Sequence, residues 1–189
     1  MKTGTMSARR YVLLDRDGTV NVERSYIADP DKVELYRGVG PALRELRAAG
    51  FGLAVVTNQS GVARGKVAPD QLERVHARLA ELLAAEGVAL DGIYVCPHGP
   101  DDGCDCRKPL PGLVTRAARE LGFDPRDSFL VGDKGIDIDL GRIVGATTVL
   151  VRTGYGVETE RERLSSPDHV ADDLPAAARW ILARAEAEP

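Results

Sequence analysis

Short apolar runs and longer amphipathic stretches alternate along this chain. The apolar runs have the length of buried strands and lie at 11–14, 51–56, 93–95, 129–131 and 147–151. The amphipathic stretches repeat apolar residues every three or four positions, as on one face of a helix, at 41–49, 70–86, 111–121 and 174–187. This alternation predicts an α/β fold: a doubly wound parallel sheet with helices on both faces.

Length and composition fit one ordinary domain. The chain has 189 residues, 43% of them hydrophobic, with no internal repeat or low-complexity segment. We therefore expect a single domain over residues 1–189, with residues 1–9 as a flexible lead-in. Residues 23–31 are too few to form a separate cap domain. Substrate choice must then depend on loops, including those that carry Arg24 and Tyr26, residues 61–66 and the cysteines described below.

The charge argues against nucleic-acid and membrane partners. With a net charge of −4 and an isoelectric point near 5.5, the chain has no general attraction for nucleic acid or an anionic membrane. No apolar run approaches membrane length, and no apolar region follows the basic residues near the start. We expect a cytoplasmic, monomeric protein that acts on a small molecule. An anionic substrate would require a local cluster of positive groups.

Polar groups of complementary kinds follow three of the predicted strands. They are Asp15 and Asp17 after the first strand, the turn 57–61 after the second, and Asp133, Lys134 and Asp137 after the fourth. In open parallel sheets, ligands bind at the carboxyl ends of the strands. If the first strand is central, these groups converge on one crevice.

Such a crevice suits phosphate chemistry with Mg²⁺. This ion prefers hard oxygen ligands and usually binds one or two carboxylates together with substrate phosphate. Thr57 and nearby backbone N–H groups can hold phosphate oxygens, while Arg107 and Lys108 supply neutralising charge. A carboxylate nucleophile such as Asp15 is chemically reasonable there, because Mg²⁺ screens its repulsion from a phosphate dianion.

Four motifs, DRDGT, TNQSG, RKP and GDKGID, resemble those of the haloacid dehalogenase superfamily of aspartyl-phosphate phosphatases, in the same order. Longer segments, among them LDRDGTVN, VVTNQSGVARGK and VLVRTG, resemble one family within it, the D-glycero-D-manno-heptose 1,7-bisphosphate 7-phosphatases. The resemblance covers residues 11–154. It implies a Mg²⁺-dependent sugar-phosphate phosphatase that removes the 7-phosphate through an aspartyl-phosphate intermediate, and a haloacid dehalogenase-like fold without a large cap domain.

The resemblance also implies catalytic and metal-binding roles. Asp15 would be the nucleophile, and Asp17 the acid that protonates the leaving sugar oxygen and then the base that activates water. Asp133 would complete the Mg²⁺ site with Asp15 and the backbone carbonyl of Asp17. Asp137 would orient Lys108 or a metal-bound water, although an acid that stabilises a helix N-terminus would also fit this position.

Other residues would contact the substrate. The resemblance implies that Thr57 and Lys108 steady the phosphoryl group and that Arg107 recognises the substrate. The remaining substrate-binding residues would be Asn58, Gln59, Ser60 and Lys134. For Lys134, a solvated surface lysine is the alternative.

All three cysteines and one of the three histidines lie within residues 96–106. Three thiolates and an imidazole match a closed, structural, tetrahedral Zn²⁺ site whose ligands are Cys96, His98, Cys104 and Cys106. The odd number of cysteines and the expected cytoplasmic location argue against disulfides. In the resembling family, this segment is a zinc-stapled loop over the active site. Because Cys106 is bonded directly to Arg107, a bound metal would also fix the phosphate-facing pair.

Two questions stay open at this point. The five residues between His98 and Cys104 resemble the histidinol-phosphate phosphatases, a related branch, whereas TNQSG, GDK and VLVRTG resemble the heptose branch. A phospho-receiver domain or a zinc-dependent interaction module would make the chain a non-enzyme. Receiver domains, however, place two adjacent acids after the first strand, and here Arg16 separates the two aspartates.

The other two histidines carry less information. His76 lies beside the apolar face of the helix at 70–86, where a boundary residue is more plausible than a metal ligand. His169 lies in a turn-like stretch, SSPDHV, with no evident partner.

Overall fold

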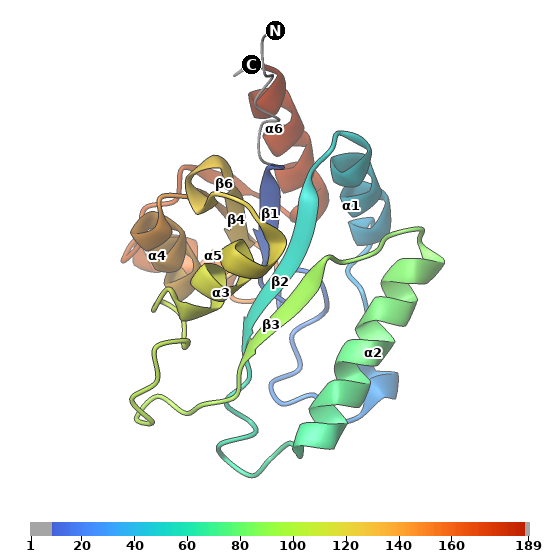
Figure 1. Cartoon of the computed structure of the whole chain (residues 1–189), viewed down its shortest axis with the longest axis vertical. Coiled ribbons are helices and arrows are strands. Elements are labelled where there is room, and N and C mark those ends of the chain that lie inside the picture. The colour runs from blue at the N-terminus through green and yellow to red at the C-terminus, as the bar shows by residue number, and fades with distance from the viewer. Residues whose placement is uncertain (1–8, 188–189) are drawn as a thin grey trace, which may run out of the picture.

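A computed structural model describes residues 9–187 of the chain, whose six strands form one parallel sheet in the order β3-β2-β1-β4-β5-β6 (Figure 1). The strands are β1 (Tyr11–Leu14), β2 (Gly52–Asn58), β3 (Gly92–Cys96), β4 (Phe129–Gly132), β5 (Thr147–Val151) and β6 (His169–Ala171). β1 pairs with β2 on one side and with β4 on the other, so Leu13 lies opposite both Ala54 and Leu130. The first strand is therefore central, and the strand order reverses beside it.

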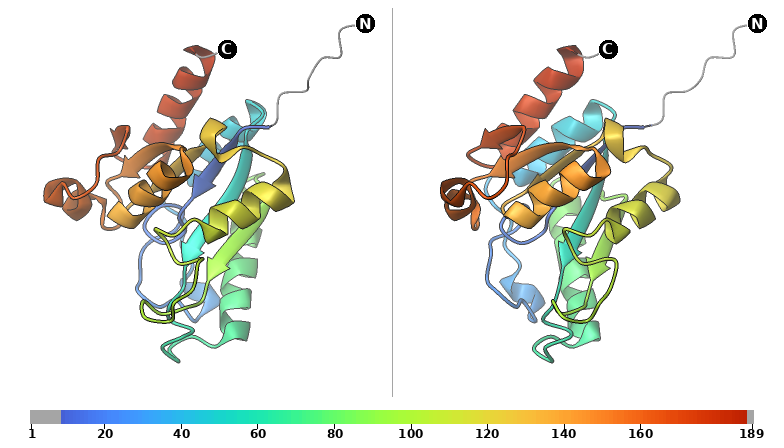
Figure 2. Two further views of the ribbon diagram at one scale, coloured as in Figure 1. Left: turned by 60° about the vertical axis from the view of Figure 1, so that its left-hand side comes forward. Right: turned by 90° about the vertical axis from the view of Figure 1, so that its left-hand side faces the viewer.

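Helices cover both faces of the sheet (Figure 2). They are α1 (Val39–Ala48), α2 (Pro69–Ala85), α3 (Gly112–Leu121), α4 (Gly135–Val144), α5 (Gly156–Glu162) and α6 (Leu174–Ala187), with short 3-10 helices η1 (Pro30–Lys32) and η2 (Pro125–Asp127). Val12 and Leu14 pack with α1, α2 and α6, whereas Tyr11 and Leu13 pack with α3 and α4. Successive residues of a strand point to opposite faces, so β1 joins both halves of the core.

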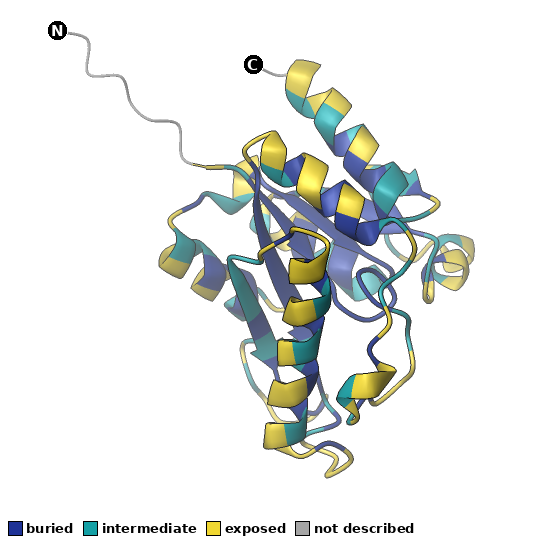
Figure 3. Cartoon of the chain, turned by 90° about the vertical axis from the view of Figure 1, so that its right-hand side faces the viewer, coloured by how far each residue is buried: buried dark blue, intermediate teal, exposed yellow. Residues whose placement is uncertain are grey.

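Burial follows this layering (Figure 3). The strands lie between the helical layers, and all four residues of β1 are buried. α2 is amphipathic, with Leu72, Val75, Leu79 and Leu83 buried while most of its other residues are exposed or half-buried. None of the helices described in residues 9–187 is both long and apolar enough to cross a membrane.

The structure confirms the predicted fold class and adds elements that the sequence pattern did not predict. α4 begins with the sequence GIDID, in which glycine and aspartate obscure the apolar face, and β6 is only three residues long. The prediction for His169 was wrong: this residue begins β6, and its ring stacks on Trp180 at 4.4 Å between centroids. Of the predicted flexible lead-in, residues 1–8 lie outside the described residues.

Candidate active site and metal clusters

Three aspartates meet at the carboxyl ends of β1 and β4, where a lysine from the loop between β3 and α3 joins them, and we call this group the carboxylate crevice. Its members are Asp15, Lys108, Asp133 and Asp137. All four are buried. Asp15 directly follows β1, Asp133 follows β4, and Asp137 lies in the first turn of α4. The predicted convergence of strand ends is therefore present.

Lys108 is the cation of the carboxylate crevice. Its Nζ lies 2.8 Å from Asp15 Oδ1 and 2.6 Å from Asp137 Oδ1, and it donates a hydrogen bond of 2.9 Å to the carbonyl of Val56. Burial alone would lower the pKa of Lys108, but Asp137 and then Asp15 outweigh it and raise the pKa. Lys108 is therefore a fixed positive charge beside Asp15. Its contact with Asp137 is the one expected if Asp137 orients Lys108.

Asp133 has one satisfied and one unsatisfied carboxylate oxygen. Oδ2 accepts a hydrogen bond of 2.8 Å from the N–H of Tyr155, whereas the buried Oδ1 has no hydrogen-bond partner among residues 9–187. Gly18 and Gly154 press against Oδ2, where a Cβ on either would come within 2.2 Å. Both glycines have positive φ, a backbone conformation that residues with a side chain rarely adopt. Neither position has room for a Cβ beside Asp133. Burial, followed by the charge of Asp15, raises the pKa of Asp133 to about 8.

The carboxylate crevice fits Mg²⁺. One oxygen from each of Asp15, Asp133 and Asp137 lies within 4.8 Å of the others. A divalent cation would compensate the excess of carboxylates and provide the missing partner for Asp133 Oδ1. The predicted ligand set was Asp15, Asp133 and the backbone carbonyl of Asp17. The side chain of Asp17 lies in a different network of hydrogen bonds.

The Asp17 carboxylate is held by three neighbouring side chains. Oδ1 accepts hydrogen bonds from Arg16 Nε at 3.1 Å and Asn21 Nδ2 at 2.9 Å, and Oδ2 accepts from Arg16 NH2 at 2.7 Å and Gln59 Nε2 at 2.9 Å. Burial alone raises the pKa of Asp17, but the charge of Arg16 and these hydrogen bonds outweigh it and lower the pKa. Gln59 Nε2 also donates to Thr57 Oγ1 at 2.9 Å. Sequence reasoning missed Arg16 and Asn21 as partners of Asp17.

Asn58 connects the end of β2 to the backbone of Lys108. Its Oδ1 accepts a 3.0 Å hydrogen bond from the N–H of Lys108, and its Nδ2 donates to the carbonyl of the same residue at 3.2 Å. Thr57 and Asn58 continue β2, although the sequence predicted a turn there. The Asn58 side chain therefore positions the lysine backbone, a contact that joins segments 50 residues apart.

A cavity of about 380 Å³ opens next to Asp17. Five predicted substrate-binding residues line it: Asn58, Gln59, Ser60, Arg107 and Lys134. Predicted residues Thr57 and Lys108 are buried next to it, in contact with Gln59 and Asp15 respectively. Further lining residues are Glu23, Ser25, Tyr26, Ile136 and Tyr155.

Lys134 is held in this cavity by two neighbours. Its Nζ donates to Glu23 Oε2 at 3.2 Å and lies 4.8 Å from the centre of the Tyr155 ring. Although burial lowers it, the pKa of Lys134 is raised by the charges of Asp133, Asp15 and Glu23. Arg24, from a loop predicted to select substrate, instead pairs with Glu34 and does not line the cavity.

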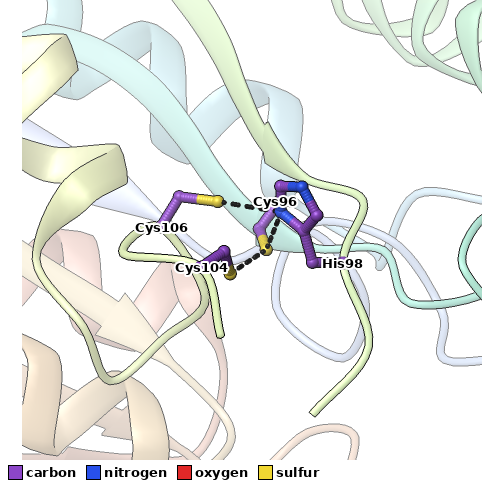
Figure 4. Close-up of side chains that lie close together, drawn as sticks. All are labelled: Cys96, His98, Cys104 and Cys106. Carbon is purple, nitrogen blue, oxygen red and sulfur yellow. Dashed lines mark hydrogen bonds between the residues drawn. The ribbon is translucent and has the colours of Figure 1, made fainter. Parts of the chain in front are cut away.

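The three cysteines and His98 converge on one point, as Figure 4 shows, and we call them the cysteine cluster. Cys96 Sγ lies 3.8 Å from Cys104 Sγ and 3.6 Å from His98 Nδ1, which lies 3.3 Å from Cys106 Sγ. Thiolates about 2.3 Å from a tetrahedral zinc ion are separated by roughly 3.8 Å. The three cysteines are free thiols, and their spacing fits a structural zinc ion.

The cysteine cluster lies directly beside the cavity. Arg107 follows Cys106 and lines the cavity, and its NH1 donates to the backbone carbonyl of His98 at 3.1 Å. The loop that carries the cysteines therefore positions both Arg107 and Lys108, by chain connectivity and by this hydrogen bond.

Known proteins of similar length are related to this chain, and two of them illustrate the relation. A D-glycero-beta-D-manno-heptose-1,7-bisphosphate 7-phosphatase from Yersinia pestis is 44% identical over 182 residues, which cover 92% of this chain and 95% of the relative. A phosphatase of the same name from Pseudomonas aeruginosa is 42% identical, with 93% of this chain and 99% of the relative covered. The family model described as HAD-hydrolase-like matches residues 105–177.

Solved structures give the same result. The crystal structure of a D,D-heptose 1,7-bisphosphate phosphatase from B. bronchiseptica, complexed with magnesium and phosphate, superposes with a TM-score of 0.87 at 37% identity, covering 93% of this chain and 99% of the other. A second such phosphatase, from Burkholderia thailandensis, superposes with a TM-score of 0.72 at 29% identity, covering 92% of this chain and 99% of the other.

Proposed function

The chain belongs to the D-glycero-beta-D-manno-heptose-1,7-bisphosphate 7-phosphatase family of HAD-like hydrolases, and on that premise we propose that it removes the 7-phosphate of D-glycero-D-manno-heptose 1,7-bisphosphate. The observation that carries the proposal is the buried ion pair of Lys108 with Asp15, next to a cavity lined by Arg107 and Lys134. The centre formed by Lys108 and Asp15 can bind the phosphate that reacts. Arg107 and Lys134 in the cavity can bind the phosphate at the other end of the sugar.

In this proposal, Asp15 is the nucleophile. Its Oδ1 accepts hydrogen bonds from Lys108 Nζ and from the N–H of Arg16, both at 2.8 Å, which fixes the plane of the carboxylate. A carboxylate oxygen of Asp15 attacks phosphorus, forming an Asp15–phosphorus bond while the bond between phosphorus and the sugar oxygen breaks. Bound Mg²⁺ would neutralise phosphate charge and orient the phosphoryl group.

Asp17 acts twice on protons. It donates a proton to the sugar oxygen as the first phosphorus–oxygen bond breaks, and then accepts a proton from the water that attacks the aspartyl phosphate. Phosphate leaves and the Asp15 carboxylate is regenerated. The lowered pKa of Asp17 keeps its carboxylate ionised, the form that can accept a proton in the second step. The negative charge of the arriving phosphate would raise this pKa and favour protonation for the first step.

The other positively charged and polar groups bind and orient the substrate. Lys108 and Thr57 steady the reacting phosphoryl group, while Asn58 holds the backbone of Lys108. Arg107 and Lys134 bind the distal phosphate, and Lys134 exchanges its contact with Glu23 for one with the substrate. We further propose that the protein is a monomer with a single domain, that it is cytoplasmic, and that it has no nucleic-acid or membrane partner.

The test is phosphate release with Mg²⁺ from heptose 1,7-bisphosphate, supplied as each anomer, and from histidinol phosphate. Histidinol phosphate is the relevant competitor because of the short interval between His98 and Cys104. We expect kcat/KM to favour the heptose by about 100-fold, or about 2.7 kcal/mol. A preference for histidinol phosphate would contradict the proposal. It would mean that the short interval between His98 and Cys104 indicates the substrate.

A further inference from the structure

Arg16 is a buried arginine between the two aspartates of the DRDGT motif. Its side chain is 1% exposed. Nε and NH2 donate to the two oxygens of Asp17 at 3.1 and 2.7 Å, the paired geometry of a guanidinium and a carboxylate. The orientation of the guanidinium plane therefore sets the orientation of the Asp17 carboxylate. A residue that holds the guanidinium of Arg16 in place therefore also affects proton transfer by Asp17.

The remaining terminal nitrogen of Arg16 meets His76 of α2. Arg16 NH1 lies 2.9 Å from His76 Nε2. Because a guanidinium can only donate, Nε2 must accept and the neutral ring must carry its proton on Nδ1. Burial, and then the positive charge of Arg16, lower the pKa of His76 to about 4. The ring is therefore neutral at neutral pH and suited to accept this hydrogen bond.

Separate parts of the fold thus position Asp17. Asn21 comes from the loop after β1 and Gln59 from the loop after β2, and each donates one hydrogen bond to the carboxylate. Arg16 donates two and is itself held by a residue 60 positions away. α2 otherwise contributes Leu72, Val75, Leu79 and Leu83 to the core, so His76 is its link to the active site.

We propose that His76 is a positioning residue for Asp17 and acts through Arg16. Its ring fixes the guanidinium plane, and the guanidinium fixes the carboxylate at the angle from which a proton reaches the sugar oxygen. The inference rests on the proposed function, because it assigns Asp17 the proton transfers of a phosphatase. His76 itself touches neither substrate nor metal in this scheme.

The variants His76→Leu and His76→Gln separate this role from packing. Leucine fills similar space without an acceptor, which leaves a buried N–H of Arg16 unpaired and its plane free to turn. The side-chain oxygen of glutamine can accept from the same position. We expect His76→Leu to lower kcat/KM for heptose 1,7-bisphosphate about tenfold, and His76→Gln to remain within about twofold of the wild-type protein.

A second substrate tests whether the loss of activity comes from protonation of the leaving group by Asp17. The leaving group of p-nitrophenyl phosphate is stable as an anion and needs little protonation. Its kcat/KM should therefore fall less than about twofold in His76→Leu. Melting temperatures are measured for both variants and for Glu73→Leu, a matched change at an exposed position of the same helix that should behave as wild type on both substrates.

Each outcome is decisive. Equal losses on both substrates, or equal losses in the leucine and glutamine variants, would assign His76 a packing role and overturn the proposal. Full activity of His76→Leu on heptose 1,7-bisphosphate would also overturn it. A wild-type protein that hydrolyses p-nitrophenyl phosphate but not heptose 1,7-bisphosphate would instead contradict the proposed function.

Discussion

The carboxylate crevice and the cysteine cluster both fit a metal ion, yet they are built in opposite ways. The three aspartates of the carboxylate crevice come from the ends of β1 and β4 and from the first turn of α4, and Lys108 reaches them from the loop between β3 and α3; all four are buried. The cysteine cluster lies within residues 96–106, and three of its four members are only half-buried. No helix or strand is described between the end of β3 and the start of α3.

This difference indicates what each site depends on. The parallel sheet and α4 place the three aspartates, and Lys108 already neutralises part of their charge, so the arrangement of the aspartates should persist without a metal. Most of the cysteine cluster lies on a loop without helix or strand, so we expect the conformation of this loop to depend on a bound metal. The two regions meet between Cys106 and Lys108. Substitutions in the two should therefore separate loss of chemistry from loss of loop structure.

The largest expected effect comes from Asp15→Asn. The amide keeps the shape of the side chain but is a poor nucleophile, so we expect kcat to fall by about 10³-fold or more while the protein stays folded. Phosphate release with saturating substrate measures this. Asp17→Asn keeps the nucleophile but should slow both protonation of the leaving sugar oxygen and hydrolysis of the aspartyl phosphate. Near-normal turnover of Asp15→Asn would contradict the nucleophile assignment.

Removing the charge of Lys108 tests whether this residue stabilises the carboxylate crevice before any metal binds. Lys108→Met leaves Asp15 and Asp137 buried without their partner, and we expect a loss of about 3–5 kcal/mol in the free energy of unfolding. Urea denaturation in the absence of added Mg²⁺ measures this. Arg107→Met is the matched control: its side chain lines the open cavity, so the expected change is within about 1 kcal/mol. Similar losses in both variants would show that the ion pair is not the cause.

Cys104→Ser should separate the two regions. We expect it to lose bound zinc and to lower kcat/KM about tenfold, because Arg107 and Lys108 lose the support of the loop. Metal analysis and phosphate release measure the two effects. Asp105→Ser, an exposed position between two ligands, should retain both zinc and activity. Full zinc content in Cys104→Ser would contradict the ligand assignment.

The same contrast explains what could be predicted from the sequence. The apolar pattern placed β1 and β4, and general rules for parallel sheets then brought Asp15 and Asp133 together. The cysteine cluster was visible because its ligands are close in sequence. The contact between Arg16 and His76 was not, since it depends on how α2 packs, and His76 has the position of an ordinary boundary residue. Likewise, nothing local indicates that the side chain of Asn58 holds the backbone of Lys108.

The smallest expected effect is the pH dependence of stabilisation by Mg²⁺. In the folded protein without Mg²⁺, burial and the charge of Asp15 raise the pKa of Asp133 from its ordinary value of 3.8 to about 8. Between these values the folded state binds a proton that the unfolded state has lost. This group therefore lowers the free energy of unfolding as pH rises from about 4 to about 8.

Mg²⁺ should oppose this loss, because it binds the ionised carboxylate and must displace the proton when the pH is lower. Between pH 6 and pH 8, the stabilisation by Mg²⁺ should therefore grow by about 1 kcal/mol, which increases the rise in melting temperature on adding Mg²⁺ by roughly 2–4 °C. Comparing scans with and without Mg²⁺ at each pH cancels the pH dependence of the cysteine cluster, which is common to both. Asp133→Asn lacks this acid, while burial raises the pKa of Asp137 only to about 6, so the variant should show a smaller rise that changes less between pH 6 and pH 8. A rise in the wild-type protein that is the same at pH 6 and pH 8 would mean that Mg²⁺ binding displaces no proton from Asp133.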